Sequence, residues 1–87
     1  FVGDCVVGAG VNIEAGAMIA NYRNERADKR IRIATPNGVI DTGVEKFGAL
    51  VGDNTRIGAN AVIAPGAILA RETIVPRLAL VDQASDN

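Results

Sequence analysis

The feature that most constrains this chain is a six-residue period of large apolar side chains. Steps of six from Phe1 to Ile19, and again from Val51 to Val75, meet a large apolar residue every time. The nine positions are Phe1, Val7, Ile13, Ile19, Val51, Ile57, Ile63, Leu69 and Val75. Only 26 of the 87 residues are Ile, Leu, Val, Met or Phe, so chance does not account for the series. An amphipathic helix repeats about every 3.6 residues, so a period of six indicates a stacked repeat instead.

A second column of small or β-branched residues lies four positions after the large one. Its members are Cys5, Val11, Ala17, Thr55, Ala61, Ala67 and Thr73. The position directly after the large residue is often Gly or Ala, which tolerate unusual corner dihedrals and let backbone layers approach closely. With 48% hydrophobic but only 3% aromatic residues, the composition suits regular stacked layers, which lie about 4.8 Å apart. The pattern predicts an all-β parallel β-helix of hexapeptide repeats, with residues 1–87 as a single domain.

The period is interrupted once, between Ile19 and Val51, whose separation of 32 residues is not a multiple of six. We therefore expect an insertion at about residues 21–50. Within it, residues 31–33 alternate like a half-exposed strand, and residues 35–38 have the Pro and Gly placement of a type I turn. Residues 39–40 can return as a second arm, so a hairpin that protrudes from the helix is predicted.

The inserted segment is rich in charge, and two interpretations of it remain open from the residues alone. Between Arg23 and Arg32 there are five Lys or Arg against two Asp or Glu. Such a run is commonly a solvated loop, but loops on rigid scaffolds also carry binding groups.

The remaining composition excludes several other classes. The net charge of −1 favours neither nucleic acid nor an anionic membrane as a partner. The longest small-apolar run, residues 61–70, is about half the length of a membrane-spanning helix. A single cysteine, Cys5, forms no internal disulfide, which favours a cytoplasmic location. No metal site is expected in a chain without histidine.

Longer strings in the sequence resemble a known family. VGDCVVGAGVNIEAGAMIANY and VGDNTRIGANAVIAPGAILA resemble the hexapeptide-repeat transferases, which form left-handed β-helices with about 18 residues in each coil. The pair Asn21-Tyr22, the basic loop, the segment 41–43 and the segment 46–54 resemble the C-terminal acyltransferase domain of bifunctional sugar-1-phosphate nucleotidylyltransferase/acetyltransferases, of the type that forms UDP-N-acetylglucosamine. The resemblance implies a homotrimer and a C-terminal fragment of a longer enzyme of nucleotide-sugar biosynthesis.

The same resemblance implies a reaction and a set of site residues. It implies acetyl transfer from acetyl-CoA to an amino-sugar phosphate or a nucleotide sugar, at a site between adjacent subunits. The implied substrate-binding residues are Asn12, Asn21, Tyr22, Lys29 and Arg32. The implied acetyl-CoA-binding residues are Ala15, Asn21, Tyr22 and Ala59. Cationic side chains can pair with phosphate oxygens, and the amide of Asn21 can hold an amine or an acyl oxygen.

Two departures from the family pattern keep a second function open. The family's general base is a histidine, which the resemblance places upstream of Phe1, and this chain has none. Phe1 also stands where the family has a tyrosine. No catalytic residue is therefore assigned within the chain. The alternative is a non-catalytic hexapeptide module for assembly or regulation of a sugar nucleotidylyltransferase, which the missing histidine favours and the pair Asn21-Tyr22 disfavours.

Overall fold

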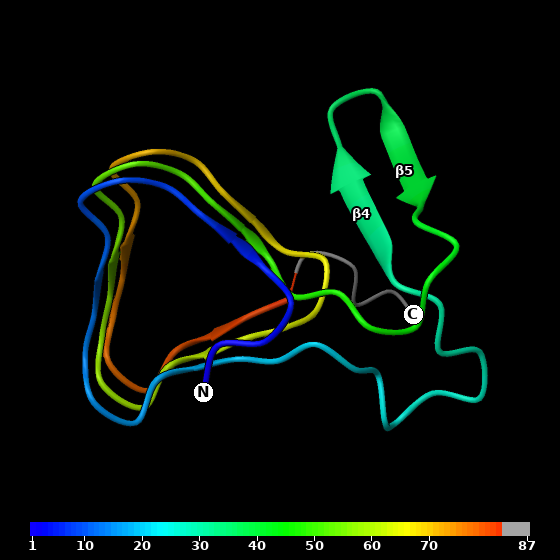
Figure 1. Cartoon of the computed structure of the whole chain (residues 1–87), viewed down its shortest axis with the longest axis horizontal. Helices are drawn as coiled ribbons and strands as arrows, with labels where there is room; N and C mark the ends of the chain where they lie inside the picture. Colours follow the sequence, from blue (N-terminus) through cyan, green and yellow to red (C-terminus); the bar gives the residue numbers. More distant parts are fainter. Residues whose placement is uncertain (83–87) are drawn as a thin grey trace.

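Short parallel strands stacked in three flat walls form a triangular coil. The computed structural model describes residues 1–82, and no helix occurs among them. One wall contains β1, β6 and β9, the second β2, β7 and β10, and the third β3, β8 and β11. In Figure 1 the chain turns counterclockwise and later coils lie farther from the viewer, so the β-helix is left-handed. The predicted all-β, left-handed parallel β-helix is confirmed.

Three coils of three strands each make up the stack. The first coil comprises β1 (Val6–Val7), β2 (Asn12–Ile13) and β3 (Met18–Ile19). The second comprises β6 (Leu50–Val51), β7 (Arg56–Ile57) and β8 (Val62–Ile63). The third comprises β9 (Ile68–Leu69), β10 (Ile74–Val75) and β11 (Leu80–Val81).

Strand pairing brings the six-residue period into vertical columns. Val7 pairs with Val51, and Val51 pairs with Leu69. The same register aligns Ile13, Ile57 and Val75 on the second wall, and Ile19, Ile63 and Val81 on the third. The period thus continues one step beyond the predicted series, to Val81. The register is the same on both sides of the insertion, so the extra residues do not disturb the stack.

The middle coil is the best-buried layer because it has a neighbour on each side. Ile57 and Ile63 have no exposed surface, and Val51 is 4% exposed, whereas Val7 in the first coil is 40% exposed. The small column is buried with them, including the polar Thr55. Its hydroxyl donates to the carbonyl of Ala70 at 3.2 Å, so burial leaves no unpaired group there.

The prediction that Phe1 belongs to the inward column is wrong. Ile19 pairs with Val2 instead, a register offset of one residue from the rest of the stack, and Phe1 is 68% exposed. Phe1 does form ladder hydrogen bonds, since its carbonyl accepts from the N–H of Ile19 at 2.8 Å and its amino group donates to the carbonyl of Ala17 at 3.2 Å. The offset of the register therefore leaves its side chain outside the inward column.

The corner residues also differ in part from the prediction. Gly58 follows a large inward residue, and a Cβ there would lie 2.5 Å from the backbone nitrogen of Arg77, so close layer approach explains it. The unusual dihedrals lie two residues further on. Asn54 and Asn60 have φ of 58° and 59°, and asparagine tolerates this left-handed region better than most residues.

The insertion leaves the coil after β3 and carries the predicted hairpin. Strand β4 (Arg32–Thr35) pairs antiparallel with β5 (Gly38–Asp41), and the two stand apart from the triangle in Figure 1. The base of the hairpin nevertheless packs on the coil. Ile31 is fully buried, and a Cβ on Gly66, whose φ is 86°, would lie 2.4 Å from the carbonyl oxygen of Arg32. We call residues 20–49 the inserted loop.

Candidate functional site

Asn21 lies at the base of the inserted loop, where the loop leaves the coil. Its carbonyl accepts a hydrogen bond from the backbone N–H of Phe47 at 2.9 Å, which closes the loop. Its side-chain Nδ2 donates to the carboxylate of Asp4 at 2.6 Å. A carboxylate only accepts hydrogen bonds, so the amide must present its NH₂ to Asp4, and Oδ1 is left for another donor.

Tyr22 and Lys29 form the next part of this site. Tyr22 is 36% exposed, and the Nζ of Lys29 lies 6.0 Å from its ring centroid, at the limit for a cation–π contact. The ammonium of Lys29 also donates to the carbonyl of Arg26. The loop therefore folds back so that Lys29 lies beside the Asn21-Tyr22 pair.

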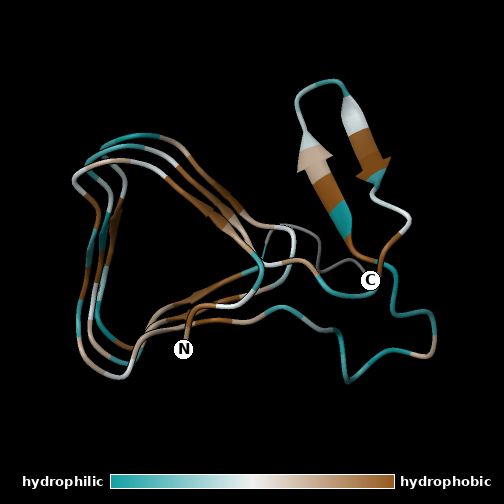
Figure 2. Ribbon diagram, viewed as in Figure 1, coloured by the Kyte–Doolittle hydropathy of each residue, from teal (hydrophilic) through white to brown (hydrophobic). Residues whose placement is uncertain are grey.

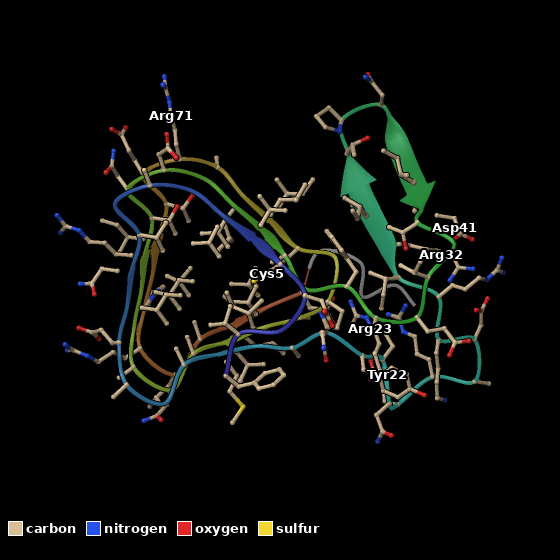
Figure 3. The ribbon with its side chains drawn as sticks, viewed as in Figure 1. Cys5, Tyr22, Arg23, Arg32, Asp41 and Arg71 are labelled. Atoms are coloured by element: carbon tan, nitrogen blue, oxygen red, sulfur yellow. The ribbon has the colours of Figure 1, made fainter. Side chains whose placement is uncertain are left out.

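Arg32 lies further from this pair, in a network of ion pairs at the base of the hairpin. Its guanidinium lies 2.9 Å from Asp28 and 3.9 Å from Asp41, and Arg30 contacts the same two carboxylates. Hydrogen bonds from Arg30 and then Arg32 hold the pKa of the Asp28 carboxyl well below its ordinary value. The charge of Arg32 is therefore already compensated within the loop. Figure 3 shows Arg32 and Asp41 next to each other on the loop side of the molecule.

Arg23 is the main residue of the loop that sequence reasoning missed. Within a segment that looked solvated, it is only 3% exposed. Its guanidinium makes two hydrogen bonds to Asp82, at 2.7 and 2.9 Å, and one to the carbonyl of Pro65 at 3.1 Å. Hydrogen bonding to Asp82 raises the pKa of Arg23. Only its position directly after Tyr22 could have drawn attention to it, since a run of charges does not show which member is buried.

Ala15 and Ala59 lie at a different corner, between the second and third walls. The carbonyl of Ala15 accepts from Asn60 at 3.2 Å, so the two coils are stacked there. The N–H of Ala59 donates to Glu14 at 2.9 Å, and its carbonyl accepts from Leu78 at 3.0 Å. Both backbone groups of Ala59 thus have partners. Ala59 can therefore make van der Waals contact with a ligand, but it has no free backbone group to form a hydrogen bond with it.

Glu14 is the carboxylate nearest this corner, and it is unsuited to act as a base. It accepts from the Arg77 guanidinium at 3.0 and 3.2 Å as well as from Ala59. The hydrogen bond from Arg77, then that from Ala59, lowers the pKa of Glu14. A carboxylate stabilised in its charged form takes up a proton poorly near neutral pH.

Asn12 is exposed on β2 and lines a hollow on the outer side of the second wall. The hollow has a volume of about 580 Å³ and is also lined by Glu14, Arg56, Ile74 and Arg77. The structure thus brings Asn12 together with the Ala15–Ala59 corner, and Asn21 together with Tyr22 and Lys29. It does not bring these two groups together, because they lie on different sides of the triangle.

The described residues 1–82 contain no cluster of His, Cys, Asp and Glu that could hold a metal ion. Over the same range no helix is long and apolar enough to cross a membrane. Cys5 is half-buried in the small inward column, and burial raises the pKa of its thiol. That environment favours a packed thiol over a nucleophile.

Comparison with known proteins identifies relatives that match most of the chain. A bifunctional sugar-1-phosphate nucleotidylyltransferase/acetyltransferase of Sulfurisphaera tokodaii is 38% identical over 66 residues, 76% of this chain and 16% of that protein. The uncharacterized acetyltransferase YaiX of Escherichia coli is 32% identical over 73 residues, 84% of this chain and 31% of that protein. The bifunctional protein GlmU of Methanococcus vannielii is 30% identical over 83 residues, 95% of this chain and 19% of that protein. No protein-family model matches the chain.

The chain spans less than a third of the length of each of these relatives. The match nevertheless includes most of the coil, whose left-handed, hexapeptide-based architecture agrees with the sequence period. The chain is therefore homologous to the hexapeptide-repeat acetyltransferases, and in particular to the C-terminal acetyltransferase part of the bifunctional sugar-1-phosphate nucleotidylyltransferase/acetyltransferases.

Proposed function

We propose that this chain is part of a cytoplasmic acetyltransferase that moves an acetyl group from acetyl-CoA to the amine of an amino-sugar phosphate or a nucleotide sugar. The observation that carries the proposal is the oriented amide of Asn21, held by Asp4 at 2.6 Å beside Tyr22 and Lys29. Relatives named as sugar-1-phosphate nucleotidylyltransferase/acetyltransferases support the choice of a sugar acceptor.

The proposed roles follow from the polar groups that remain available. The Oδ1 of Asn21 accepts an N–H of the acceptor amine and turns its lone pair toward the acyl carbon. The Tyr22 hydroxyl contacts the same junction of sugar and thioester. Lys29 supplies positive charge for the sugar phosphate. Arg32 contributes to the positive electrostatic potential of the loop rather than binding the phosphate directly, because Asp28 and Asp41 already pair with it.

Acetyl-CoA fits the corner of Ala15 and Ala59 by shape. Small side chains there leave room for an extended ligand against the backbone, and the backbone groups of Ala59 already have partners. Bound there, acetyl-CoA would supply the activated acyl group as a thioester.

The separation of the two groups of residues supports a homotrimer. Asn12, Ala15 and Ala59 lie on one side of the triangle and Asn21, Tyr22 and Lys29 on another, so they can share a ligand only if two copies of the chain meet. The third wall presents Met18, Val62 and Leu80 outward, with 50%, 38% and 69% of their surface exposed. An apolar column of this kind is suited to burial between subunits.

The general base is the group that this chain does not provide. The chain has no histidine, and Arg77 keeps Glu14 charged. We propose that a histidine in a preceding part of the full-length protein takes the proton from the attacking amine. The lack of histidine in this chain also supports the second candidate function, a non-catalytic module for assembly or regulation of a sugar nucleotidylyltransferase.

The deciding experiment measures thiol release from acetyl-CoA by the full-length protein, with and without an amino-sugar phosphate. The proposal expects release that depends on the amino sugar and falls at least tenfold in Asn21→Ala. Asn24→Ala, an exposed residue of the same loop, is the matched control and should retain activity. A well-folded trimer without amino-sugar-dependent release would favour the assembly module instead.

A further inference from the structure

The outward side of the second wall differs in chemistry from the other two. The first wall presents Val6, Leu50 and Ile68 outward, and the third presents Met18, Val62 and Leu80. The register of the second wall places Asn12 beside Arg56, and Arg56 beside Ile74. Figure 2 shows hydrophilic segments on this side of the triangle, next to the hydrophobic residues of the same strands. Two adjacent coils thus place an amide and a guanidinium side by side, one strand spacing apart (about 4.8 Å).

These two side chains line the hollow of about 580 Å³ described above, which we call the wall hollow. It contains two guanidinium groups, those of Arg56 and Arg77, and one carboxylate, that of Glu14. The carboxylate of Glu14 forms an ion pair with Arg77, with Oε1 of Glu14 3.0 Å from Nε of Arg77. Among residues 1–82, no ion-pair or hydrogen-bond partner of the Arg56 side chain is found. The wall hollow therefore carries one uncompensated positive charge on a protein whose net charge is −1.

The cations of the inserted loop are less available than Arg56. Arg32 is shared between Asp28 and Asp41, and the ammonium of Lys29 is bound to the carbonyl of Arg26. An anion that enters from solvent would have to compete with these partners. At Arg56 it would displace only water, so the whole charge-assisted interaction is gained.

We propose that the wall hollow is an anion subsite in which Arg56 binds a phosphate group and Asn12 donates to an oxygen of the attached sugar. The guanidinium offers two parallel N–H groups to the phosphate, and exposed Ile74 offers an apolar surface to the sugar ring. That the anion is the phosphate of the acceptor sugar rests on the proposed function, in which Lys29 of an adjacent copy contributes charge to the same phosphate. The binding of inorganic phosphate by Arg56 does not depend on the proposed function.

The first experiment uses inorganic phosphate as the probe and the full chain, with backbone amides followed by NMR during a titration. Saturable shifts are expected around Asn12, Arg56 and Ile74. Arg56→Gln should weaken this binding about tenfold, and Arg56→Lys should weaken it less because the charge remains. Arg71→Gln is the matched control, since Arg71 is also exposed and lies at a different corner (Figure 3). Absence of saturable shifts, or shifts centred on Lys29 and unchanged in Arg56→Gln, would overturn the proposal.

A second experiment separates this inference from the proposed function. The full-length protein is titrated with glucosamine 1-phosphate and with glucosamine. The dissociation constant of glucosamine divided by that of glucosamine 1-phosphate is the ratio compared between variants. The proposal expects Arg56→Gln to reduce that ratio about tenfold while affinity for glucosamine is unchanged. An unchanged ratio would overturn the subsite even if acetyl transfer is normal. A lowered ratio without acetyl transfer would uphold the subsite and reject the acetyltransferase.

Discussion

Leu78 combines two unfavourable properties at one position. It has a φ of 65° and is 77% exposed, at the corner where the equivalent residues of the first two coils are Gly16 and Asn60. A left-handed conformation costs a residue with a branched side chain roughly 1–2 kcal/mol, and glycine or asparagine much less. The corner thus contains strain that packing of the leucine does not offset.

We expect Leu78→Asn to stabilise the protein by about 1 kcal/mol. For a chain of this size, that corresponds to a rise in Tm of about 4–8 °C. Thermal unfolding followed by circular dichroism checks it. Val6→Asn is the control, because Val6 is 62% exposed but has ordinary strand geometry. An equal gain in both variants would show that removal of an exposed apolar side chain, not relief of strain, is responsible.

The carboxylate of Asp4 determines which way the side-chain amide of Asn21 faces, because it accepts a hydrogen bond from Nδ2. We expect Asp4→Ala to change the side-chain NH₂ signals of Asn21 in NMR spectra, with a loss of stability of about 1 kcal/mol or less. Asp53→Ala is a fair control, since the carboxylate of Asp53 also accepts a hydrogen bond, from the backbone N–H of Ala9 at 2.9 Å, but lies at another corner. Unchanged Asn21 signals in Asp4→Ala would show that the amide is oriented by other contacts.

Among the elements, the inserted loop depends on one buried side chain for its attachment. Arg23 joins the start of the loop to Pro65 and Asp82, and Ile31 packs on the corner at Gly66. The loop is thus held at its base, while β4 and β5 extend beyond it with Val39 and other residues exposed.

Arg23→Ala should destabilise the protein by about 3 kcal/mol, because it removes a buried guanidinium together with its two hydrogen bonds to Asp82 and its hydrogen bond to the carbonyl of Pro65. Denaturant unfolding measures the loss, and hydrogen exchange should show faster exchange at the amides of Ile31 and Thr42, which bond within the loop. Arg30→Ala, in an exposed ion pair, should cost less than about 1 kcal/mol. Similar losses in the two variants would contradict the assigned role of Arg23.

The elements were largely predictable from the sequence, and the contacts between them were not. The six-residue period identified the inward columns, and the Pro36-Asn37-Gly38 turn identified the hairpin, because both are local patterns. The burial of Arg23 depends on Asp82, which lies 59 residues away, and no local pattern encodes that pairing. The separation of Asn12 from Asn21 likewise follows from which wall each strand occupies.

At the scale of the whole molecule, the ion pair between Glu14 and Arg77 connects the first coil to the third. Glu14 accepts from Ala59 in the second coil and from Arg77 in the third. Because the folded-state pKa of Glu14 is lowered, its stabilisation is present above the ordinary pKa of a glutamate and is lost as the pH falls through the lowered value. Strong acid should therefore weaken this corner.

An NMR titration of the Glu14 carboxyl should give a pKa that returns toward the ordinary value in Arg77→Gln. Arg71→Gln, which removes an exposed arginine from another corner, should leave the titration of Glu14 unchanged. A Glu14 titration that is the same in wild type and Arg77→Gln would show that the ion pair does not persist in solution.

The closed base of the inserted loop has a consequence for how such proteins diversify. The chain leaves and rejoins the coil at one corner, where Phe47 bonds to Asn21, and the columns resume in register after 26 added residues. Doubling the length of a flexible loop costs only about 0.6 kcal/mol of closure entropy. The coil can therefore accept inserted loops of different length and charge at this corner while the stacked columns of the scaffold stay the same.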